Sequence, residues 1–366
     1  MFVVDPGNVA YFLAERRLLA FDSVVDGDFM VVDQTSRNRN LKVVRRKSPG
    51  FFIKQVSYPS PEYTQTLARE AACYRLANGH PEFGAMRALM PEFHHFDPAR
   101  HVLVVELLDD AESLWEYHQR AHSFPTEVAK LQGRTLGSYH GQVKAEAAQQ
   151  GAPGVFPGQI PWILSLHETN PAYLGTVSRG NAQLIAILQQ YPEFESALSG
   201  IKAGWNYSSL IHGDIKWENM MLCHGGGDPA PRLKIIDWEI ADIGDECWDV
   251  GAVIQAYVTF WIFSLPLSGG ASIAEAVAAA PLDAESMKPA LAAYWNAYAE
   301  GRGLGADASR AMLLRSMNCA AARMIQTAYE SIQATPQISP YALCKLQVSM
   351  NILHDPEAAV AEFVGL

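Results

Sequence analysis

The sequence lacks the features of a zinc-bound, disulfide-linked, secreted or membrane-spanning protein. Its five cysteines include no Cys-x-x-Cys pair, so we expect reduced thiols rather than a zinc site or a disulfide framework. No uninterrupted apolar stretch reaches the roughly 18 residues of a membrane span, and no membrane partner is expected. Residues 1–17 contain Asp5 and Glu15 and no basic start, which argues against a signal peptide. These absences predict a cytoplasmic protein. The cysteines are Cys73, Cys223, Cys247, Cys319 and Cys344.

Charge is also scarce. Only 18% of the residues are charged and the net charge is -11. A nucleic-acid binder needs a basic face that displaces counterions, so nucleic acid is excluded as a partner. An acidic surface suits solubility or a cationic ligand. With 366 residues, 49% of them hydrophobic, the chain is long enough for two lobes with separate cores.

The first 108 residues contain runs of β-branched and aromatic residues separated by turn formers. Such runs predict strands joined as an antiparallel meander. A helix should begin near Pro61, because apolar residues then recur at helical spacing as far as the Asn78-Gly79 turn. We therefore expect residues 1–108 to form a nucleotide-binding lobe with a five-stranded antiparallel sheet and one long helix. The predicted strands cover residues 29–34, 41–44, 51–55, 92–96 and 101–107.

Beyond a connector at 109–112 the pattern becomes helical, and it stays so from Val250 to the C-terminus. Residues 109–366 are therefore expected to form a mostly helical catalytic and acceptor-binding lobe. The whole chain is predicted to be an α+β protein with two lobes. Further helices are predicted at 113–121, 126–149, 179–190 and 193–198.

Three polar residues are spaced in a pattern that suits phosphoryl transfer. Asp214 follows Leu210-Ile211-His212-Gly213, so a strand end leads into a loop whose carboxylate can receive the proton of an acceptor hydroxyl. Asn219 offers a carbonyl oxygen five residues later, and Asp237 emerges after the apolar run 233–236. Oxygen atoms are the ligands that Mg²⁺ prefers. The sequence thus predicts a kinase that uses ATP and Mg²⁺, with Asn219 and Asp237 as metal ligands at the end of one hairpin.

These motifs resemble, in order and content, those of the aminoglycoside phosphotransferase and choline kinase family, which has the protein-kinase-like fold. The resemblance implies that Lys54, in Phe51-Phe52-Ile53-Lys54, contacts the α- and β-phosphates and that Glu70 is its ion-pair partner. It also implies that the backbone of Glu106 and Leu108 meets the adenine. Asp249 is similar to an aspartate that braces the catalytic loop.

Two features depart from the general kinase pattern. The loop 36–40 has no glycine, although protein kinases place a glycine-rich loop over the phosphates; Ser36 and Asn38 are candidates to donate hydrogen bonds there instead. Lys216 follows the catalytic aspartate by two residues, which is the arrangement of Ser/Thr protein kinases, where that lysine steadies the γ-phosphate.

Other residues near the motifs have a structural reading and a functional one. His212 is interpreted as a hydrogen-bonding residue of the loop rather than as the base. The tryptophans Trp217, Trp238 and Trp248 either pack in the core or line an acceptor pocket. The nearby carboxylates either form a solvated acidic rim or hold a cationic acceptor. They are Glu218, Glu239, Asp242, Asp245 and Glu246.

The identity of the acceptor is left open between two classes. The first is the hydroxyl of a small molecule. The second is a Ser or Thr of a precursor peptide, suggested by Lys216 and by a resemblance to the kinase subunits of split lanthipeptide synthetases, which act with a partner lyase. A pseudokinase that binds nucleotide without turnover is the third hypothesis.

Overall fold

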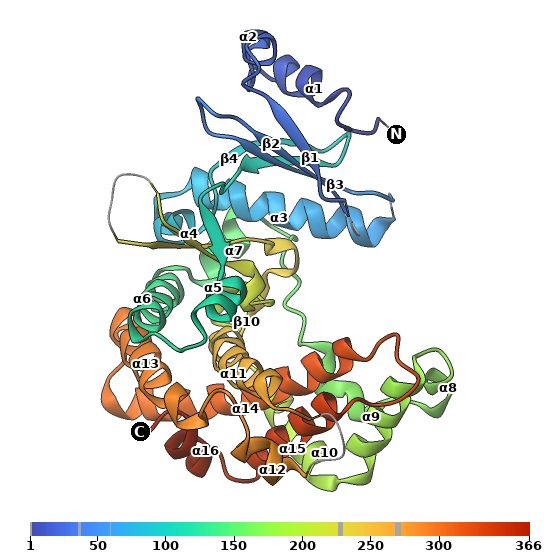
Figure 1. Cartoon of the computed structure of the whole chain (residues 1–366), viewed down its shortest axis with the longest axis vertical. Helices are drawn as coiled ribbons and strands as arrows, with labels where there is room; N and C mark the ends of the chain where they lie inside the picture. Colours follow the sequence, from blue (N-terminus) through green and yellow to red (C-terminus); the bar gives the residue numbers. More distant parts are fainter. Residues whose placement is uncertain (1, 36–37, 59, 226–229, 268–271) are drawn as a thin grey trace. The chain divides into compact units, whose positions relative to one another are not determined.

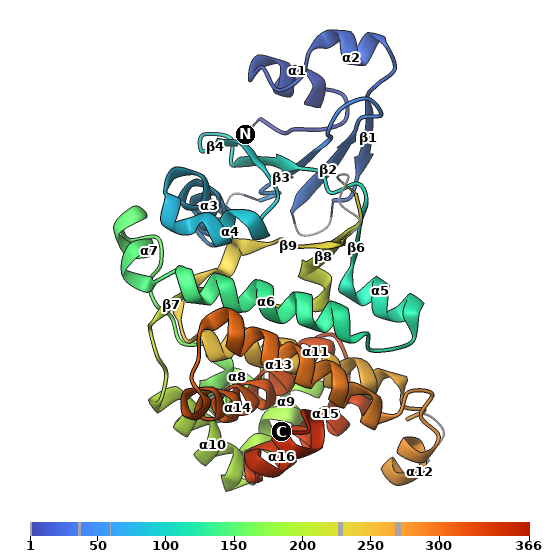
Figure 2. The same cartoon turned by 90° about the vertical axis from the view of Figure 1, so that its left-hand side faces the viewer.

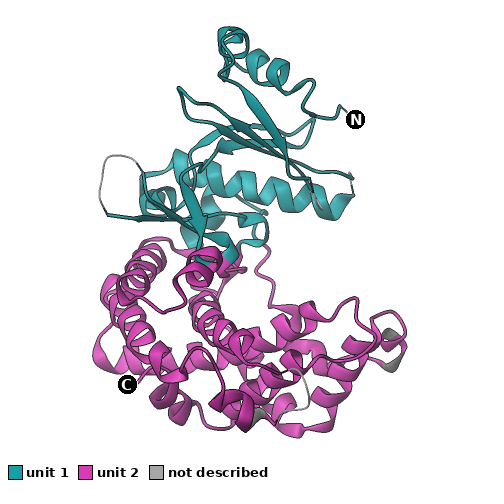
Figure 3. Cartoon of the chain, in the orientation of Figure 1, with its two compact units in different colours: residues 1–114, 146–156, 218–241 teal, residues 115–145, 157–217, 242–366 magenta. Residues whose placement is uncertain are grey.

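The computed structural model describes residues 2–35, 38–58, 60–225, 230–267 and 272–366. The chain divides into two compact units, which Figure 3 distinguishes by colour. Unit 1 contains residues 1–114, 146–156 and 218–241, and unit 2 contains residues 115–145, 157–217 and 242–366. The chain thus passes between the units several times.

Unit 1 is built on the five-stranded antiparallel sheet that the sequence predicts (Figure 1). The strand order is β1-β2-β3-β5-β4, so β3 lies at the centre and β1 and β4 form the edges. The strands are rich in valine, isoleucine and phenylalanine, which pack well on a pleated surface. They are β1 (Met30–Asp33), β2 (Arg39–Val44), β3 (Phe51–Gln55), β4 (Phe93–Asp97) and β5 (Val102–Glu106).

The two faces of this sheet are covered by different helices (Figures 1 and 2). One face carries the buried cluster that joins Leu41, Val43 and Ile53 to α1 (Val9–Glu15). Because successive side chains of a strand point to opposite faces, Lys54 of β3 points away from α1. The other face belongs to α3 (Pro61–Gly79), which begins at the residue predicted and is capped by the Ser60 hydroxyl. Neither α1 nor α2 (Phe21–Val25) was predicted.

A second sheet in unit 1 corrects the predicted connector. Residues 109–112 were expected to be a simple linker, but β6 (Ala111–Ser113) pairs with β8 (Met220–Cys223), which pairs with β9 (Arg232–Ile235). The sequence gives no sign of this pairing because its partner lies about a hundred residues further along the chain. The remaining elements of unit 1 are short: η1 (Pro81–Phe83), α4 (Gly84–Leu89), α7 (Ala145–Gly151), η3 (Trp217–Asn219) and η4 (Trp238–Ile240).

Unit 2 is helical apart from a two-stranded sheet of β7 (Ser209–Ile211) and β10 (Asp242–Gly244). Its first helices are α5 (Leu114–Ala121), α6 (Thr126–Gln142), η2 (Trp162–Glu168), α8 (Pro171–Leu174), α9 (Arg179–Gln190) and α10 (Pro192–Ala203). The later ones are α11 (Glu246–Ser264), α12 (Ile273–Ala278), η5 (Ala284–Met287), α13 (Lys288–Arg302), α14 (Ala306–Ser331), α15 (Pro340–His354) and α16 (Pro356–Phe363).

The helix predicted over 126–149 is in fact two helices. α6 ends at Gln142, because Lys144 forms a β-bridge with Ser209 and the Ala145 amide donates to the Ser208 carbonyl oxygen at 3.2 Å. These bonds to a distant segment replace the next helical turn. α7 then begins at Ala145.

The helices of unit 2 pack closely around α11, of which almost every residue as far as Ile262 is buried. α6 approaches α13 at Gly133, where a side-chain carbon would lie 2.1 Å from the Tyr294 carbonyl oxygen. The mostly helical remainder that the sequence predicts is therefore confirmed. Within the ranges that the structure describes, none of the helices has the length and apolar character needed to cross a membrane.

Candidate active site

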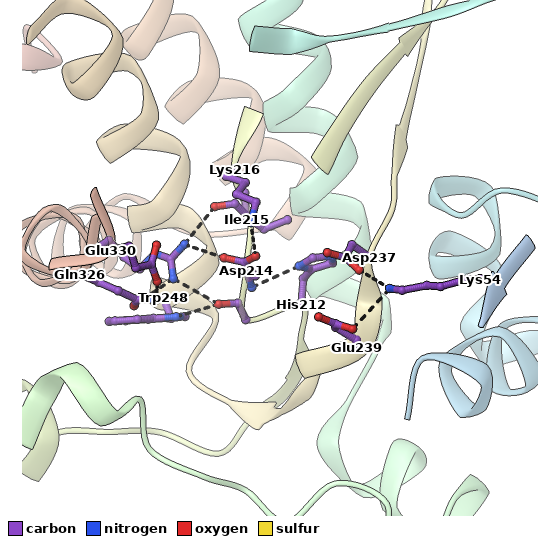
Figure 4. Close-up of polar contacts among 12 residues, drawn as sticks. Lys54, His212, Asp214, Ile215, Lys216, Asp237, Glu239, Trp248, Gln326 and Glu330 are labelled. Atoms are coloured by element: carbon purple, nitrogen blue, oxygen red, sulfur yellow. Dashed lines mark hydrogen bonds and ion pairs between the residues drawn. The ribbon is translucent and has the colours of Figure 1, made fainter. Parts of the chain in front are cut away.

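Lys54 lies among three carboxylates in unit 1, and Figure 4 shows two of them, those of Asp237 and Glu239, beside it. Its Nζ is 2.7 Å from Oε2 of Glu70, 2.5 Å from Oδ1 of Asp237 and 3.4 Å from Oε2 of Glu239. The side chains of Lys54, Glu70 and Glu239 are at most 10% exposed, whereas that of Asp237 is 34% exposed. The structure therefore brings together Lys54, Glu70 and Asp237, as the sequence predicts, and adds Glu239.

Each member of this cluster is placed by its own element. Lys54 follows three apolar residues on the central strand, and Glu70 is in the third turn of α3 on the face that packs against the sheet. Asp237 adopts a left-handed backbone conformation (φ 68°, ψ 55°) directly after β9 and begins the short helix η4, which carries Glu239. An aspartate is one of the few residues other than glycine that tolerates this conformation.

Burial and neighbouring charges shift the pKa values of Lys54 and Glu70. Burial alone lowers the pKa of the Lys54 ammonium, but the carboxylates of Glu70, Asp237 and Glu239 outweigh it and raise that pKa well above its usual range. Burial raises the pKa of Glu70, and Lys54 opposes part of that rise. Lys54 is therefore a fixed cation at neutral pH.

Asn219 and Asp237 lie at the same end of the β8–β9 hairpin, as the sequence predicts for the two metal ligands. Asn219 immediately precedes β8, and the Ile236 amide donates to its carbonyl oxygen at 3.0 Å. Asp237 directly follows Ile236 in the chain. Oxygen atoms of Glu70, Asp237 and Glu239 lie within 4.8 Å of one another, which is a set of hard donors that fits Mg²⁺.

Asp214 lies in unit 2 between two cations (Figure 4). Lys216 Nζ is 2.7 Å from its Oδ2, and one terminal nitrogen of Arg323 is 3.2 Å from its Oδ1. Burial would raise the pKa of Asp214, but Arg323 first and then Lys216 hold that pKa well below its usual range. Asp214 is ionised at neutral pH and is a weak base while both cations are in place.

The loop that carries Asp214 is fixed from below by Asp249 of α11. The Asp249 carboxylate is completely buried and accepts hydrogen bonds from the amides of His212 at 2.7 Å and Gly213 at 2.9 Å. His212 in turn accepts a hydrogen bond on Nδ1 from the Asp214 amide at 3.2 Å. Asp249 thus occupies the bracing position that the resemblance implies, and His212 holds the loop.

The remaining predicted nucleotide-binding residues are spread over unit 1. Glu106 is the last residue of β5, and its amide donates to the Glu92 carbonyl oxygen at 2.8 Å. Leu108 follows β5 outside any strand and is partly exposed. Asn38 is 8% exposed just before β2. Ser36 lies outside the described residues. None of the three described residues, Glu106, Leu108 and Asn38, forms a hydrogen bond or ion pair with Lys54, and the roles of all four residues stay predictions.

The tryptophans near the motifs pack in the core. Trp217, Trp238 and Trp248 are each at most 2% exposed, so none lines an acceptor pocket. Trp217 stacks on His118 with ring centroids 4.0 Å apart, and Trp248 donates to the Gly213 carbonyl oxygen at 3.2 Å.

Three of the nearby carboxylates correct the sequence interpretation, which offered a solvated rim or an acceptor site. Asp242, Asp245 and Glu246 are at most 9% exposed and are used within unit 2. Asp242 accepts from two loop amides, Asp245 caps α11, and Glu246 pairs with an arginine of α13. Buried carboxylates need such partners. Glu218 alone of this group is exposed.

Sequence reasoning missed two members of the site. Glu239 was predicted to belong to a solvated rim or to an acceptor site. It lies two residues after Asp237 on a short helix, and its carboxylate is 3.4 Å from the ammonium of Lys54. Arg323 was not noted at all. The available signal was a single charged residue within the apolar stretch 319–325 of a helix, because a buried charge needs a partner.

These features make the protein a kinase with the protein-kinase-like fold, as the sequence predicts. More closely, the chain belongs to the phosphotransferase enzyme family, whose model matches residues 31–294. The match covers both Asp214 and the residues around Lys54.

Two solved structures share this fold over nearly their whole length. The choline kinase of Cryptosporidium parvum Iowa II is 13% identical, with 98% of this chain and 98% of that chain covered and a TM-score of 0.55. The macrolide 2'-phosphotransferase of Brachybacterium faecium is 15% identical, with 96% of this chain and 99% of that chain covered and a TM-score of 0.51. At these identities the likeness concerns the fold. No curated protein matches the chain.

Proposed function

We propose that the protein transfers the γ-phosphate of ATP, in the presence of Mg²⁺, to a hydroxyl of a small molecule. The observation that carries the proposal is the cluster of Lys54 with Glu70, Asp237 and Glu239, a buried cation beside an accessible carboxylate. We assign the nucleotide to residues 1–108, where Glu106, Leu108, Asn38 and Ser36 are the further candidates. The acceptor belongs to residues 109–366.

The residues divide the chemistry between them. Lys54 is held by Glu70 as a fixed cation for the α- and β-phosphates. Asn219 and Asp237 offer oxygen ligands for Mg²⁺, with Glu239 as a third carboxylate in reach. The metal, when bound, neutralises charge on the phosphates. Asp214 orients the acceptor hydroxyl and receives its proton.

Movement of Lys216 would change the basicity of the Asp214 carboxylate during turnover. The lysine side chain is 43% exposed, so it can leave Asp214 for a phosphate oxygen when the nucleotide is bound. Removing one cation from Asp214 raises the basicity of the carboxylate. The oxygen that Lys216 vacates, Oδ2, is then available to the hydroxyl of the acceptor.

The test is transfer of labelled phosphate from ATP to a panel of amino alcohols, aminoglycosides and macrolides, with mass-spectrometric detection of the product. Asp214→Asn should lower kcat by roughly 10²–10⁴-fold, which is the usual contribution of a positioned base. Asp26→Asn, which replaces an exposed aspartate, is the matched control and should keep full activity. Turnover of Asp214→Asn at the wild-type rate would rule out the assigned role of Asp214.

The same assay separates the two other hypotheses. A peptide kinase would leave the panel unmodified and phosphorylate a Ser- or Thr-rich precursor peptide, with a partner lyase eliminating the phosphate. The arrangement of Lys216 beside Asp214 is the observation that suggests it. A pseudokinase would gain thermal stability from ATP with Mg²⁺ and transfer no phosphate to any acceptor.

A further inference from the structure

Arg323 reaches the catalytic loop from a part of the chain that the family model does not match. The match ends at residue 294, and Arg323 belongs to α14 (Ala306–Ser331). The residue is 4% exposed, so its charge is withdrawn from water. Burying a guanidinium costs free energy unless its N–H groups find hydrogen-bond partners. The partners of Arg323 therefore indicate its role.

The guanidinium of Arg323 binds three consecutive residues of the loop. One terminal nitrogen donates to Asp214 Oδ1 at 3.2 Å and to the Ile215 carbonyl oxygen at 3.4 Å. The other donates to the Gly213 carbonyl oxygen at 3.5 Å. The guanidinium also lies 5.3 Å from the centre of the Trp248 ring. The N–H groups of a planar guanidinium can bind backbone carbonyl oxygens and a carboxylate at the same time, with a fixed geometry that an ammonium group does not provide.

Gln326 keeps this fork in place. It lies one turn further along α14 and accepts a hydrogen bond from Arg323 at 3.1 Å, while its own amide nitrogen donates to Glu330 at 2.8 Å. An amide side chain can accept and donate in this way without carrying a charge. Residues at these spacings share one helix face. Figure 4 shows Gln326 and Glu330 on the helix beside the loop.

The two cations of Asp214 differ in their freedom. The side chain of Arg323 is 5% exposed and that of Lys216 is 43% exposed. Arg323 therefore holds Oδ1 throughout turnover, whereas Lys216 can leave Oδ2. A carboxylate held at one oxygen presents the other in a fixed direction, and reaction rates depend steeply on such alignment.

We propose that Arg323 is the positioning residue of the base: it fixes Asp214 through Oδ1 so that Oδ2 faces the acceptor hydroxyl. Gln326 supports it by holding the guanidinium. This inference rests on the proposed function, in which Asp214 receives the proton of the acceptor.

The experiment measures kcat and KM for nucleotide and acceptor in Arg323→Lys, with Arg310→Lys as the matched control. Arg310 lies on the same helix and pairs with a carboxylate of α16 at the surface. Arg323→Lys should lower kcat by about 30- to 100-fold and leave the nucleotide KM within about twofold, because the residue orients Asp214 and binds no nucleotide. Arg310→Lys should match the wild type.

A double-mutant cycle separates positioning from a general loss of structure. In an Asp214→Asn background, Arg323→Lys should cost less than about twofold further, since the residue acts only through Asp214. Equal costs in both backgrounds would overturn the inference, as would a wild-type kcat for Arg323→Lys. If Asp214→Asn itself is fully active, the proposed function fails. If Asp214→Asn is inactive and Arg323→Lys is unchanged, only this inference fails.

A second variant covers the case in which Arg323→Lys does not fold. Gln326→Met keeps the arginine and its charge but removes the group that holds it. It should lower kcat by about three- to tenfold with an unchanged nucleotide KM, and the loss should vanish in the Asp214→Asn background. An unchanged kcat in Gln326→Met would overturn the proposal in that case.

Discussion

The charged clusters of the two units are opposite in composition. In unit 1 one ammonium, that of Lys54, lies among three carboxylates, whereas in unit 2 one carboxylate, that of Asp214, lies between two cations. When all groups are ionised, the first cluster has an excess of negative charge and the second an excess of positive charge. The first therefore suits a divalent cation, and the second suits a phosphate oxygen.

The two clusters also share a design. In each, one member is accessible, Asp237 at 34% and Lys216 at 43% side-chain exposure. The other members are less exposed: Lys54, Glu70 and Glu239 are at most 10% exposed, Arg323 is 5% exposed and Asp214 is 20% exposed. In both clusters the buried groups fix the geometry, and the accessible ones can reach ligands. Substitutions of Asp237, Lys54, Lys345 and Lys216 test this division.

Replacing the accessible carboxylate of unit 1 should have the largest effect. Asp237→Asn keeps the shape and the backbone conformation but removes the charge that we assign to Mg²⁺. We expect kcat to fall by at least about 10³-fold, because a metal supplies several kcal/mol of charge stabilisation in phosphoryl transfer. Initial rates over a Mg²⁺ titration are the measurement. If Asp237→Asn turns over at the wild-type rate and with the wild-type dependence on Mg²⁺ concentration, the accessible carboxylate does not bind the metal.

Removing the buried cation of unit 1 should destabilise the fold. Lys54→Met leaves Glu70 and Glu239 without their ammonium, and breaking a buried ion pair typically costs about 3–5 kcal/mol. Urea unfolding measures the loss. Lys47→Met, at an exposed position, is the control.

Adding divalent ions to Lys54→Met tests the charge balance of the cluster in unit 1. If the cluster has an excess of negative charge, Mg²⁺ or Mn²⁺ should raise the melting temperature of Lys54→Met by more than that of the wild type, since the ion takes the place of the ammonium. An equal rise in both proteins would contradict the charge balance drawn here.

Lys345 extends the comparison to a cation without a carboxylate ligand. It is completely buried in α15, and no hydrogen-bond partner of its Nζ is found among the described residues. Burial lowers the pKa of Lys345 to about 8, against a smaller opposing effect of Glu330. Lys345→Met should therefore stabilise the protein by about 2–3 kcal/mol at neutral pH, because burying this charge is costly and the Phe263 ring, with its centre 4.6 Å from Nζ, offsets only part of the cost. Lys130→Met, on the surface, should change stability by less than about 0.5 kcal/mol.

The pH dependence of this gain has a definite sign. Between about pH 8 and the usual lysine pKa of about 10.4, the unfolded chain retains the Lys345 proton that the folded protein has lost. Since the unfolded state then binds more protons, the wild type gains stability as pH rises through this window. The difference between Lys345→Met and the wild type should shrink correspondingly in urea titrations from pH 7 to 10.5. A constant difference would show that the pKa of Lys345 is the same in the folded and the unfolded protein, and would contradict its lowering by burial.

The smallest structural effect is expected at the accessible cation of unit 2. Lys216→Met should change the free energy of unfolding by less than about 0.5 kcal/mol, because exposed ion pairs contribute little. Its kcat should nevertheless fall by roughly tenfold if Lys216 moves to the phosphate. Thermal unfolding and steady-state rates on one preparation give both values. A large loss of stability would break the distinction between buried and accessible members.

Much of the fold follows from the sequence because its signals are local. The strand at 51–55 is bounded by turn formers and matches β3 at both ends, and α3 begins at Pro61 as predicted. Local sequence patterns do not reveal which strands pair when the two strands are far apart in the chain. The break after Gln142 depends on Ser208 and Ser209, and β6 depends on β8, so neither could be read from its own residues.

The candidate site divides in the same way. Asp214 and Asp237 were predicted because each follows an apolar run, and Asn219 because it lies five residues after Asp214, a spacing typical of kinases. Lys54 and Glu70 were then placed by the resemblance, and the structure pairs them at 2.7 Å. Arg323 lies more than a hundred residues from Asp214, in an alanine-rich helix without a motif. Only packing brings it to the loop, so no local pattern reveals it.

The backbone of Asp237 has a consequence for how this protein can change. At φ 68° and ψ 55° the residue occupies a conformation that asparagine and glycine also adopt at little cost. Codons for both differ from an aspartate codon by a single base. The position to which we assign the metal is therefore also one where mutation readily supplies a well-tolerated neutral substitute. Descendants of this gene can thus lose catalysis in one step while keeping a folded protein available for another use.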